Sequence, residues 1–174
     1  LHMEQNGILL INNDDANSKH LLTHTFPGTI IKIGINTASH YRAENVEYTD
    51  EGMNFNVILH GKSLPFYIPI FGVHNVYNAL FAIAVADRLG FSYEEISIAL
   101  KEYKRPRMRM VTRKLNGDIT LIDDSFSANL NAMKAAIDVL VNVGGDGTKV
   151  AVLGDMKGLG VITKKAHLEI GSYA

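Results

Sequence analysis

The 174-residue sequence contains no cysteine. This absence excludes disulfide bonds, thiolate-bound metal sites and a cysteine nucleophile. A chain without cysteine also fits a reducing compartment, and we expect a cytoplasmic protein. Any chemistry must therefore rest on other side chains.

Long apolar runs and an excess of one charge are absent as well. The longest apolar run, Ala79 to Ala86, is far shorter than the roughly 20 residues that a membrane-spanning helix needs. No signal peptide is visible. The formal net charge is −1 and 47% of the residues are hydrophobic, as in soluble globular proteins. We therefore predict no membrane insertion.

Positive charge gathers between Lys101 and Lys114, where Glu102 is the single acid. Such a run suits a nucleic-acid-binding patch, a solvated linker or a hinge that faces phosphate. Aromatic residues do not alternate with the basic ones as they do on single-strand-binding surfaces. We expect no nucleic-acid partner, and the linker and the hinge remain open.

Both ends of the sequence look cut. Leu1-His2-Met3 resembles a cloning remnant. Glu169 to Ala174 stop inside an expected helix without a C-cap signal. We expect the chain to be a piece of a longer protein.

Residues 1–105 form the first of two predicted parts, which ends where Lys104-Arg105-Pro106-Arg107 interrupts helical structure. The expected elements are strands at 7–12 and 29–35, a short helix at 16–24, antiparallel strands at 42–49, 53–60 and 64–70, and helices at 73–89 and 93–103. Pro65 and Pro69 predict that the last strand lies at a sheet edge or beside a bulge. Ser92 and Glu95 form a capping-box signal.

Residues 106–174 form the second part, in which strands and helices alternate. The expected elements are a hairpin of strands 108–115 and 118–123 around Asn116-Gly117, a helix at 131–143, a buried strand at 149–153 and a helix from Lys164. This alternation predicts an α/β domain with a largely parallel sheet. The predicted fold class of the whole chain is α/β.

A pair of amides at the start of the helix 73–89 is the main candidate site. Asn75 and Asn78 are three residues apart and share a helix face. Each amide offers a donor and an acceptor, which can match the edge of adenine. Alternatively, the two residues merely cap the helix. His74 beside them could contact a nucleotide or orient Asn75, or have a purely structural role.

Acidic residues follow two predicted strands. Asp123-Asp124-Ser125 comes after Ile119–Ile122, and Asp155 comes after Leu153-Gly154. Carboxylates at the carboxyl ends of strands lie where α/β folds bind ligands. They could accept from ribose hydroxyls or hold a magnesium-bound water, or form an ordinary strand-end turn.

Two glycine-rich segments do not fit nucleotide-binding loops. Gly61-Lys62-Ser63 has Asn56 where a P-loop needs its first glycine, and a strand follows it. Gly144-Gly145-Asp146-Gly147 follows a helix and precedes a predicted strand, the reverse of a dinucleotide fingerprint. His20 and His24 have the spacing of a metal pair without an evident third ligand.

These segments together resemble the Mur ligases, a family of ATP-dependent enzymes that form amide bonds in peptidoglycan precursor synthesis. The resemblance rests on segments in the family's order: Asn12-Asn13-Asp14-Asp15, Gly72-x-His74-Asn75-Val76-Tyr77-Asn78-Ala79-Leu80, Arg109-Met110, Asp123-Asp124-Ser125-Phe126-Ser127-Ala128-Asn129 and Leu153-Gly154-Asp155-Met156…Leu159-Gly160. The chain departs from the pattern at Ser127, Leu130 and Gly158, where the family usually has Asn, Pro and an acid. The resemblance implies that residues 1–105 form the end of a central ATPase domain and that residues 106–174 form the start of a Rossmann-like C-terminal domain.

The resemblance also implies a nucleotide site shared by the two parts. It assigns Asn75 and Asn78 to the adenine, with His74 beside them. It assigns Asp124 to the ribose and Arg109 to the ribose or a phosphate. Because the paired amides and the strand-end acid suggested a nucleoside independently, the two lines of reasoning agree.

The implied reaction uses ATP and Mg²⁺. The acidic block is most similar to that of the members that add D-alanyl-D-alanine to UDP-N-acetylmuramoyl-tripeptide through an acyl phosphate, with Ser125 and Asn129 on the substrate side. The family's phosphate loop, magnesium ligands and modified lysine all precede the position of Asn12. The resemblance therefore predicts that this chain carries the adenine and ribose half of the site, has no catalytic residue of its own and is inactive alone.

Two other functions remain open at this point. One is a non-catalytic α/β module that binds a nucleotide. The other is a related ligase, either of another Mur step or of the folylpolyglutamate type, although the Asp-Asp-Ser-Phe-x-Ala-Asn block argues against it.

Overall fold

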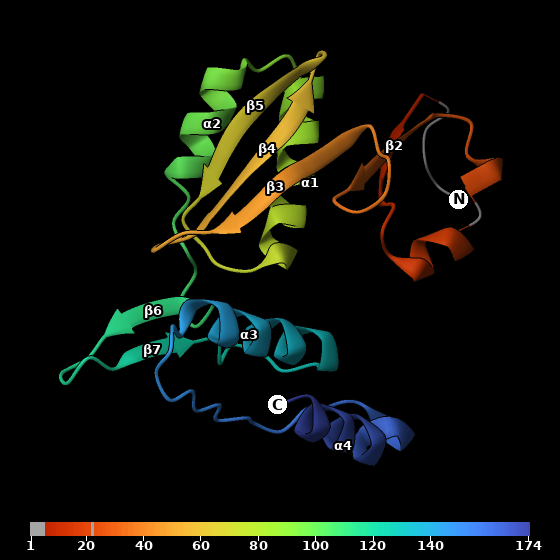
Figure 1. The fold of residues 1–174 in the computed structure, drawn as a ribbon. Helices are drawn as coiled ribbons and strands as arrows, with labels where there is room; N and C mark the ends of the chain where they lie inside the picture. Colours follow the sequence, from red (N-terminus) through yellow and green to blue (C-terminus); the bar gives the residue numbers. More distant parts are fainter. Residues whose placement is uncertain (1–5, 22) are drawn as a thin grey trace.

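The computed structural model describes residues 6–21 and 23–174, so the cloning remnant expected at Leu1-His2-Met3 lies outside the described residues. The first part is built on a five-stranded sheet in the order β1-β2-β3-β4-β5 (Figure 1). The strands are β1 (Ile8–Asn12), β2 (Thr29–Gly34), β3 (Tyr41–Tyr48), β4 (Met53–Leu59) and β5 (Lys62–Ile68). β1, β2 and β3 are parallel, and β4 and β5 continue the sheet as antiparallel strands.

Alternation along β4 shows why this sheet has one buried face. Met53, Phe55 and Val57 are fully buried, whereas Asn54 between them is exposed, as expected where successive side chains point to opposite faces. β5 is the outer strand, which confirms the edge position predicted from Pro65. A proline tolerates that position because it cannot donate to a neighbouring strand.

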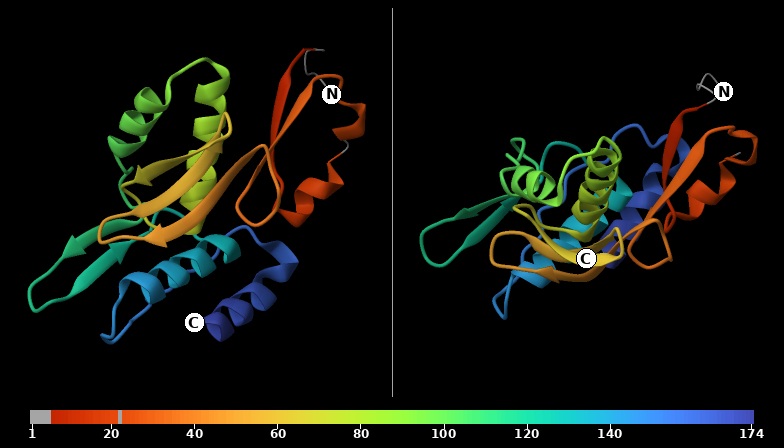
Figure 2. Two further views of the ribbon diagram at one scale, coloured as in Figure 1. Left: turned by 45° about the horizontal axis from the view of Figure 1, so that its top comes forward. Right: turned by 90° about the horizontal axis from the view of Figure 1, so that it is seen from above.

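Two helices cover the buried face of the sheet (Figures 1 and 2). Helix α1 (Val73–Arg88) buries Val76, Ala79, Leu80, Ile83 and Ala84, a spacing that keeps them on one face. Gly90 follows α1 with a positive φ of 88°, as expected for a C′ glycine. Helix α2 (Tyr93–Lys101) packs on β5 and begins with the predicted capping box. No helix of the described residues is long and apolar enough to cross a membrane.

The segment between β1 and β2 differs from the prediction. Instead of one helix over residues 16–24, it contains two short 3₁₀ helices, η1 (Ala16–His20) and η2 (Thr23–Thr25). Neither contains a buried residue. Most helical stability in proteins comes from packing an apolar face. Because these two short helices bury no side chain, no such packing stabilises a longer α-helix here.

The second part begins with an antiparallel pair, β6 (Val111–Lys114) and β7 (Thr120–Asp123). The predicted hairpin is confirmed, but its loop is longer than two residues, since Leu115 N–H donates to the Ile119 carbonyl. Gly117 and Asp118 both have positive φ there. Helices α3 (Leu130–Val143) and α4 (Thr163–Tyr173) follow, with a short 3₁₀ helix η3 (Gly160–Ile162) before α4.

The predicted buried strand at 149–153 is wrong. The segment is irregular in the structure, and Val150 and Val152 are 72% and 94% exposed. The sheet of the second part is also not parallel, because its described strands, β6 and β7, are antiparallel. An apolar run becomes a strand only when a neighbouring strand satisfies its backbone groups. Within the described residues, no strand pairs with this run.

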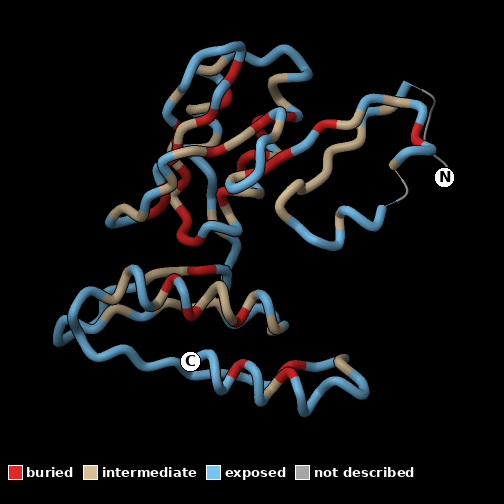
Figure 3. The backbone as a smooth tube through the Cα atoms, turned by 45° about the vertical axis from the view of Figure 1, so that its right-hand side comes forward, coloured by how far each residue is buried: buried red, intermediate tan, exposed pale blue. Residues whose placement is uncertain are grey.

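Helix α3 connects the two apolar cores. Its residues Met133 and Ile137 pack with Met156, Ala166 and Ile170, whereas Val139 and the hinge residue Met110 belong to the core of the first part. In Figure 3 the buried stretches, in red, lie along the sheet of the first part and along the helices of the second part. The fold class is α/β, as predicted. The boundary at 105/106 stays a prediction.

Candidate functional site

Gly72 precedes α1 and sets the geometry of the amide pair. Its backbone has φ 103° and ψ 135°, a region that is open almost only to glycine. A Cβ built on Gly72 would lie 2.5 Å from the His74 ring and 3.2 Å from Cγ2 of Val139 on α3. The glycine therefore leaves room beside the start of α1 for the His74 ring and for Val139 of the second part.

The two amides lie side by side, as the three-residue spacing predicts. The Asn75 Nδ2 group donates to the Phe71 carbonyl at 2.8 Å and to Nε2 of His74 at 2.9 Å. The Asn75 Oδ1 atom accepts from Nδ2 of Asn78 at 3.2 Å. Among the described residues, no side-chain hydrogen bond caps α1 at its N-cap residue Gly72. The Asn75 amide nevertheless bonds to the Phe71 carbonyl just before the helix, so the nucleotide role and the structural role of this pair both stay predictions. Asn75 is held by its neighbours, and the exposed Asn78 presents its amide to solvent.

His74 is held as a neutral ring. An amide nitrogen can only donate, so Nε2 of His74 accepts and the proton of the neutral ring resides on Nδ1. Desolvation by the surrounding chain lowers the pKa of His74, although the nearby Asp124 carboxylate opposes this shift. The lowered pKa agrees with the acceptor role of the ring.

Asp124 lies directly after β7 and faces the hinge. Its Oδ1 accepts the backbone N–H of Met110 at 3.1 Å. Burial raises the pKa of Asp124, and the Met110 hydrogen bond and the nearby His74 and Arg109 oppose that rise. The structure thus brings both His74 and Arg109 within electrostatic range of Asp124, although they come from different parts of the chain.

Arg109 sits in a tightly bent hinge. Met108 and Met110 on either side of it have positive φ values of 60° and 47°, which L-residues rarely adopt. The guanidinium lies 4.3 Å from the centroid of the Phe126 ring, close enough for a cation–π contact. The exposed Arg109 side chain therefore lies over the ring of Phe126, in the loop that follows Asp124.

The other residues of the acidic block have local partners. Asp123 accepts from the Ser125 hydroxyl at 2.6 Å and from the Ser125 N–H at 3.2 Å, which is the strand-end turn considered above. Asn129 is the N-cap of α3 and accepts from Ala132 N–H at 2.9 Å. The substrate-side roles of Ser125 and Asn129 stay predictions. Asp155 does not end a strand, so the expectation of acidic ends on two neighbouring strands is wrong.

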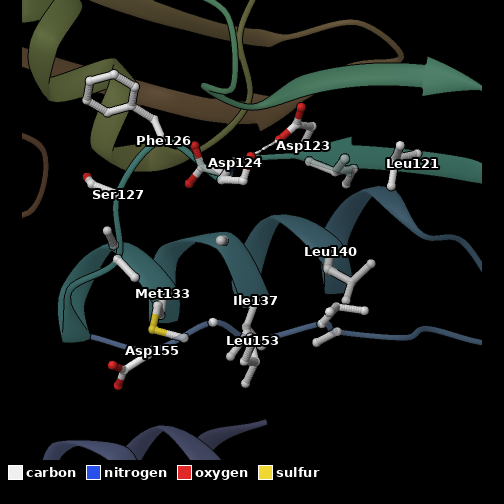
Figure 4. Close-up of a pocket in the computed structure, with 18 of the residues that line it drawn as sticks. Leu121, Asp123, Asp124, Phe126, Ser127, Met133, Ile137, Leu140, Leu153 and Asp155 are labelled. Atoms are coloured by element: carbon white, nitrogen blue, oxygen red, sulfur yellow. Dashed lines mark hydrogen bonds between the residues drawn. The ribbon is translucent and has the colours of Figure 1, made fainter. Parts of the chain in front are cut away.

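A cavity of about 810 Å³ lies between β7, α3 and the segment 151–155 (Figure 4). Asp124 and Phe126 lie at one end, and Met133, Ile137 and Leu140 of α3 line its apolar side. Of the described residues around it, neither Asn75 nor Asn78 is in the lining. The cavity therefore adjoins the acidic end of the candidate site, whereas the amides form an open surface.

Three residues outside the predicted set hold this site together. Arg105 donates to the carbonyls of Met110 and Glu51, so it clamps the hinge to the turn between β3 and β4. The sequence showed Arg105 only as part of a basic run. Asp14 and Tyr77, which are 63 positions apart, form a hydrogen bond of 2.6 Å; the signals for Asp14 were its place after the first strand and its segment in the family resemblance.

The described residues contain no group of three or more His, Asp or Glu side chains that could hold a metal ion. His20 and His24 lie in different 3₁₀ helices, so they do not share one helix face. The chemistry gathered near the hinge is instead that of an exposed amide, an exposed guanidinium and a half-buried carboxylate. Such a set can recognise a base, hydroxyls and a phosphate.

Two family models match the chain. The model of the Mur ligase middle domain matches residues 1–86, and the model of the Mur ligase glutamate ligase domain matches residues 106–174. UDP-N-acetylmuramoyl-tripeptide–D-alanyl-D-alanine ligase of Bacillus subtilis (strain 168) is 32% identical over 170 residues, which cover 98% of this chain and 36% of that protein. The chain thus spans little more than a third of the length of such relatives.

Solved structures show the same arrangement. A MurF from Acinetobacter baumannii superposes with a TM-score of 0.88 at 28% identity, over 98% of this chain and 36% of that one. The MurF ligase of Thermotoga maritima in complex with ADP superposes with a TM-score of 0.84 at 20% identity, over 99% of this chain and 39% of that one. The second likeness is one of fold.

Proposed function

Because the chain belongs to the Mur ligase family, we propose that it forms the adenine- and ribose-binding part of an ATP-dependent ligase of peptidoglycan precursor synthesis. One observation carries this proposal. The exposed amide of Asn78 donates a hydrogen bond to Asn75 at the start of α1. His74 in the same turn lies near Asp124, which also lies near Arg109.

Each side chain has a role that suits its chemistry. The Asn78 amide, with its donor and acceptor, pairs with the edge of adenine. Asn75 supports Asn78, and His74 holds Asn75 through the Nε2 contact. Asp124 accepts from ribose hydroxyls, and Arg109 contacts the ribose or a phosphate. The Thermotoga maritima ligase, which has the same fold, is in complex with ADP, and this agrees with the proposal of a nucleotide site.

The proposed reaction adds D-alanyl-D-alanine to UDP-N-acetylmuramoyl-tripeptide, as the name of the Bacillus subtilis relative states for that protein. The substrate carboxylate attacks the γ-phosphate of ATP, ADP leaves, and an acyl phosphate forms. The dipeptide amine then displaces phosphate and forms the amide. Ser125 and Asn129, beyond the ribose contact, lie on the substrate side of this scheme.

The described residues supply only part of what this reaction needs. Phosphoryl transfer depends on charge neutralisation around the γ-phosphate, commonly by a P-loop and Mg²⁺. The 174 residues contain no P-loop sequence. We therefore place the magnesium ligands and the γ-phosphate contacts outside these 174 residues, and we expect this chain to bind adenine nucleotide without turnover.

Calorimetric titration of the chain with ADP tests the nucleotide site. Replacing Asn78 by Ala removes one or two neutral hydrogen bonds, a loss of about 1–3 kcal/mol, so we expect the affinity for ADP to fall roughly 5- to 150-fold. Asn142→Ala is the matched control, because Asn142 is an exposed amide on α3 whose Nδ2 donates within its own helix. Equal affinities of the two variants would refute the role of Asn78.

The second candidate function is a nucleotide-binding module without catalysis, which the same amide pair and acid would serve. Determining any coding sequence upstream of this chain would distinguish the ligase from the non-catalytic module. A glycine-rich Gly-Lys-[Thr/Ser] loop there would support the ligase. Phosphate release measured with ATP, tripeptide substrate and D-alanyl-D-alanine gives a second test. Turnover by the 174 residues alone would contradict the proposal that the γ-phosphate contacts and magnesium ligands lie outside them.

A further inference from the structure

Asp14 binds two separate segments of the first part. Its carboxylate accepts the backbone N–H groups of Ile35, Asn36 and Thr37 at 2.6, 3.0 and 2.8 Å. It also accepts the hydroxyl of Tyr77 on α1 at 2.6 Å. Burial by itself would raise the pKa of Asp14, but these hydrogen bonds outweigh it and hold the pKa well below its usual range. The carboxylate is therefore a fixed, charged acceptor between the loop after β2 and helix α1.

Tyr77 lies next to the exposed amide around the axis of α1. Successive residues of a helix are rotated by about 100°, so Asn78 lies between Asn75 and Tyr77 around the helix. Asn75 is tied to Phe71 and His74 on one side, and Tyr77 is tied to Asp14 on the other. The rotation of this turn is therefore held from both sides of Asn78.

We propose that Asp14 and Tyr77 are positioning residues for the nucleotide, which fix the turn of α1 that carries Asn78 through the Asp14–Tyr77 hydrogen bond. This inference rests on the function proposed above. Neither residue needs to touch the ligand. The hydrogen bond makes the base-binding amide depend on the loop at the carboxyl end of β1, 63 positions away in the sequence.

The opposite end of α1 offers a matched comparison. There the Tyr41 hydroxyl donates to Asp87 at 2.5 Å, and His60 contacts the same carboxylate at 2.8 Å. Both tyrosine–aspartate bonds join α1 to the sheet region, and both raise the pKa of their tyrosine, chiefly through burial and then through the bond itself. Only the Tyr77 bond lies in the turn that carries the amides.

The experiment compares Tyr77→Phe with Tyr41→Phe in the 174-residue chain. ADP affinity is measured by calorimetry and stability by urea unfolding. We expect both variants to lose stability, but only Tyr77→Phe to lose ADP affinity, by roughly 2- to 30-fold, the range seen for residues that act on a site without touching the ligand. Equal ADP affinities would overturn the proposal.

Asp14→Asn gives a second variant that preserves the shape of the side chain. If the hydrogen bond carries the effect, the double variant with Tyr77→Phe should lose less affinity than the sum of the single losses. Additive losses would count against the bond as the cause.

Side-chain amide resonances of Asn78 in ¹⁵N-correlation spectra supply a readout that needs no nucleotide. We expect Tyr77→Phe to shift these resonances and Tyr41→Phe to leave them in place. Unchanged resonances in Tyr77→Phe would refute the proposal that Tyr77 positions Asn78. The outcomes separate the two proposals. An unaltered affinity in Asn78→Ala, or no ADP binding at all, removes the proposed function, whereas a loss in Asn78→Ala without one in Tyr77→Phe removes only the positioning role.

Discussion

Replacing Gly72 by Ala should destabilise this chain because the new side chain would combine a strained backbone with two close contacts. The residue has φ 103°, and its new Cβ would approach the His74 ring to 2.5 Å and Val139 to 3.2 Å. The Val139 contact joins the start of α1 to α3, so its relief requires these helices to move apart. The His74 ring lies on α1 itself and would have to turn aside.

The magnitude follows from two separate effects. Holding a residue with a side chain in this backbone region costs about 1–3 kcal/mol. Overpacking at a close contact costs about 1–3 kcal/mol more. We therefore expect Gly72→Ala to lower the free energy of unfolding by roughly 2–6 kcal/mol.

Gly61→Ala is the control for the backbone effect alone. Gly61 has φ 78° in the turn between β4 and β5, and a methyl group added there would have nothing within 4 Å of it. We expect a loss of about 1–2 kcal/mol there. The measurement is urea unfolding, with the dependence on denaturant checked for a common slope. A loss in Gly72→Ala no larger than that in Gly61→Ala would show that the close approach to His74 and Val139 is not real.

Three further outcomes follow from the hydrogen bonds and charges at the hinge. Asn75→Ala should lower the free energy of unfolding by about 1–3 kcal/mol because it leaves its partners unpaired, whereas Asn78→Ala should change it by less than about 0.5 kcal/mol; equal losses in urea unfolding would contradict this division. The folded chain lowers the pKa of His74 below its ordinary value of 6.5, so the unfolded chain binds more protons below that pH and stability should fall as the pH decreases through 6.5. His74→Gln should flatten this part of the pH–stability curve, and an unchanged curve would argue against the neutral ring. Arg105→Met should increase proteolytic cleavage at the hinge because the clamp to Glu51 is lost, while Lys104→Met, an exposed control, should not; equal cleavage rates would reject the clamp.

Local patterns in the sequence predicted a large part of the fold. The capping box of Ser92 and Glu95, the glycine after α1 and the alternation along β4 each involve residues close together in the chain. Their physical causes are short-range hydrogen bonds and the periodicity of burial. The same holds for the shared face of Asn75 and Asn78, which helix geometry alone places side by side.

The failures have a common cause in long-range pairing. The apolar run at 149–153 looked like a buried strand, but a strand depends on a neighbour that a local pattern does not specify. The helix expected at 16–24 lacked a surface to pack against, so it forms only short 3₁₀ turns. In both segments the residue types were compatible with the prediction, and the missing contact decided the outcome.

Spacing along the chain was enough to predict that two amides share one face of a helix, that a basic segment follows and that an acid ends a later strand. Each of these features depends on near neighbours. Three contacts became evident only in the folded chain. Asp124 comes within electrostatic range of His74 and Arg109, Arg105 clamps the hinge, and Asp14 reaches Tyr77. Those contacts join segments far apart in the chain, and their formation depends on how helices and strands pack, which no local spacing encodes.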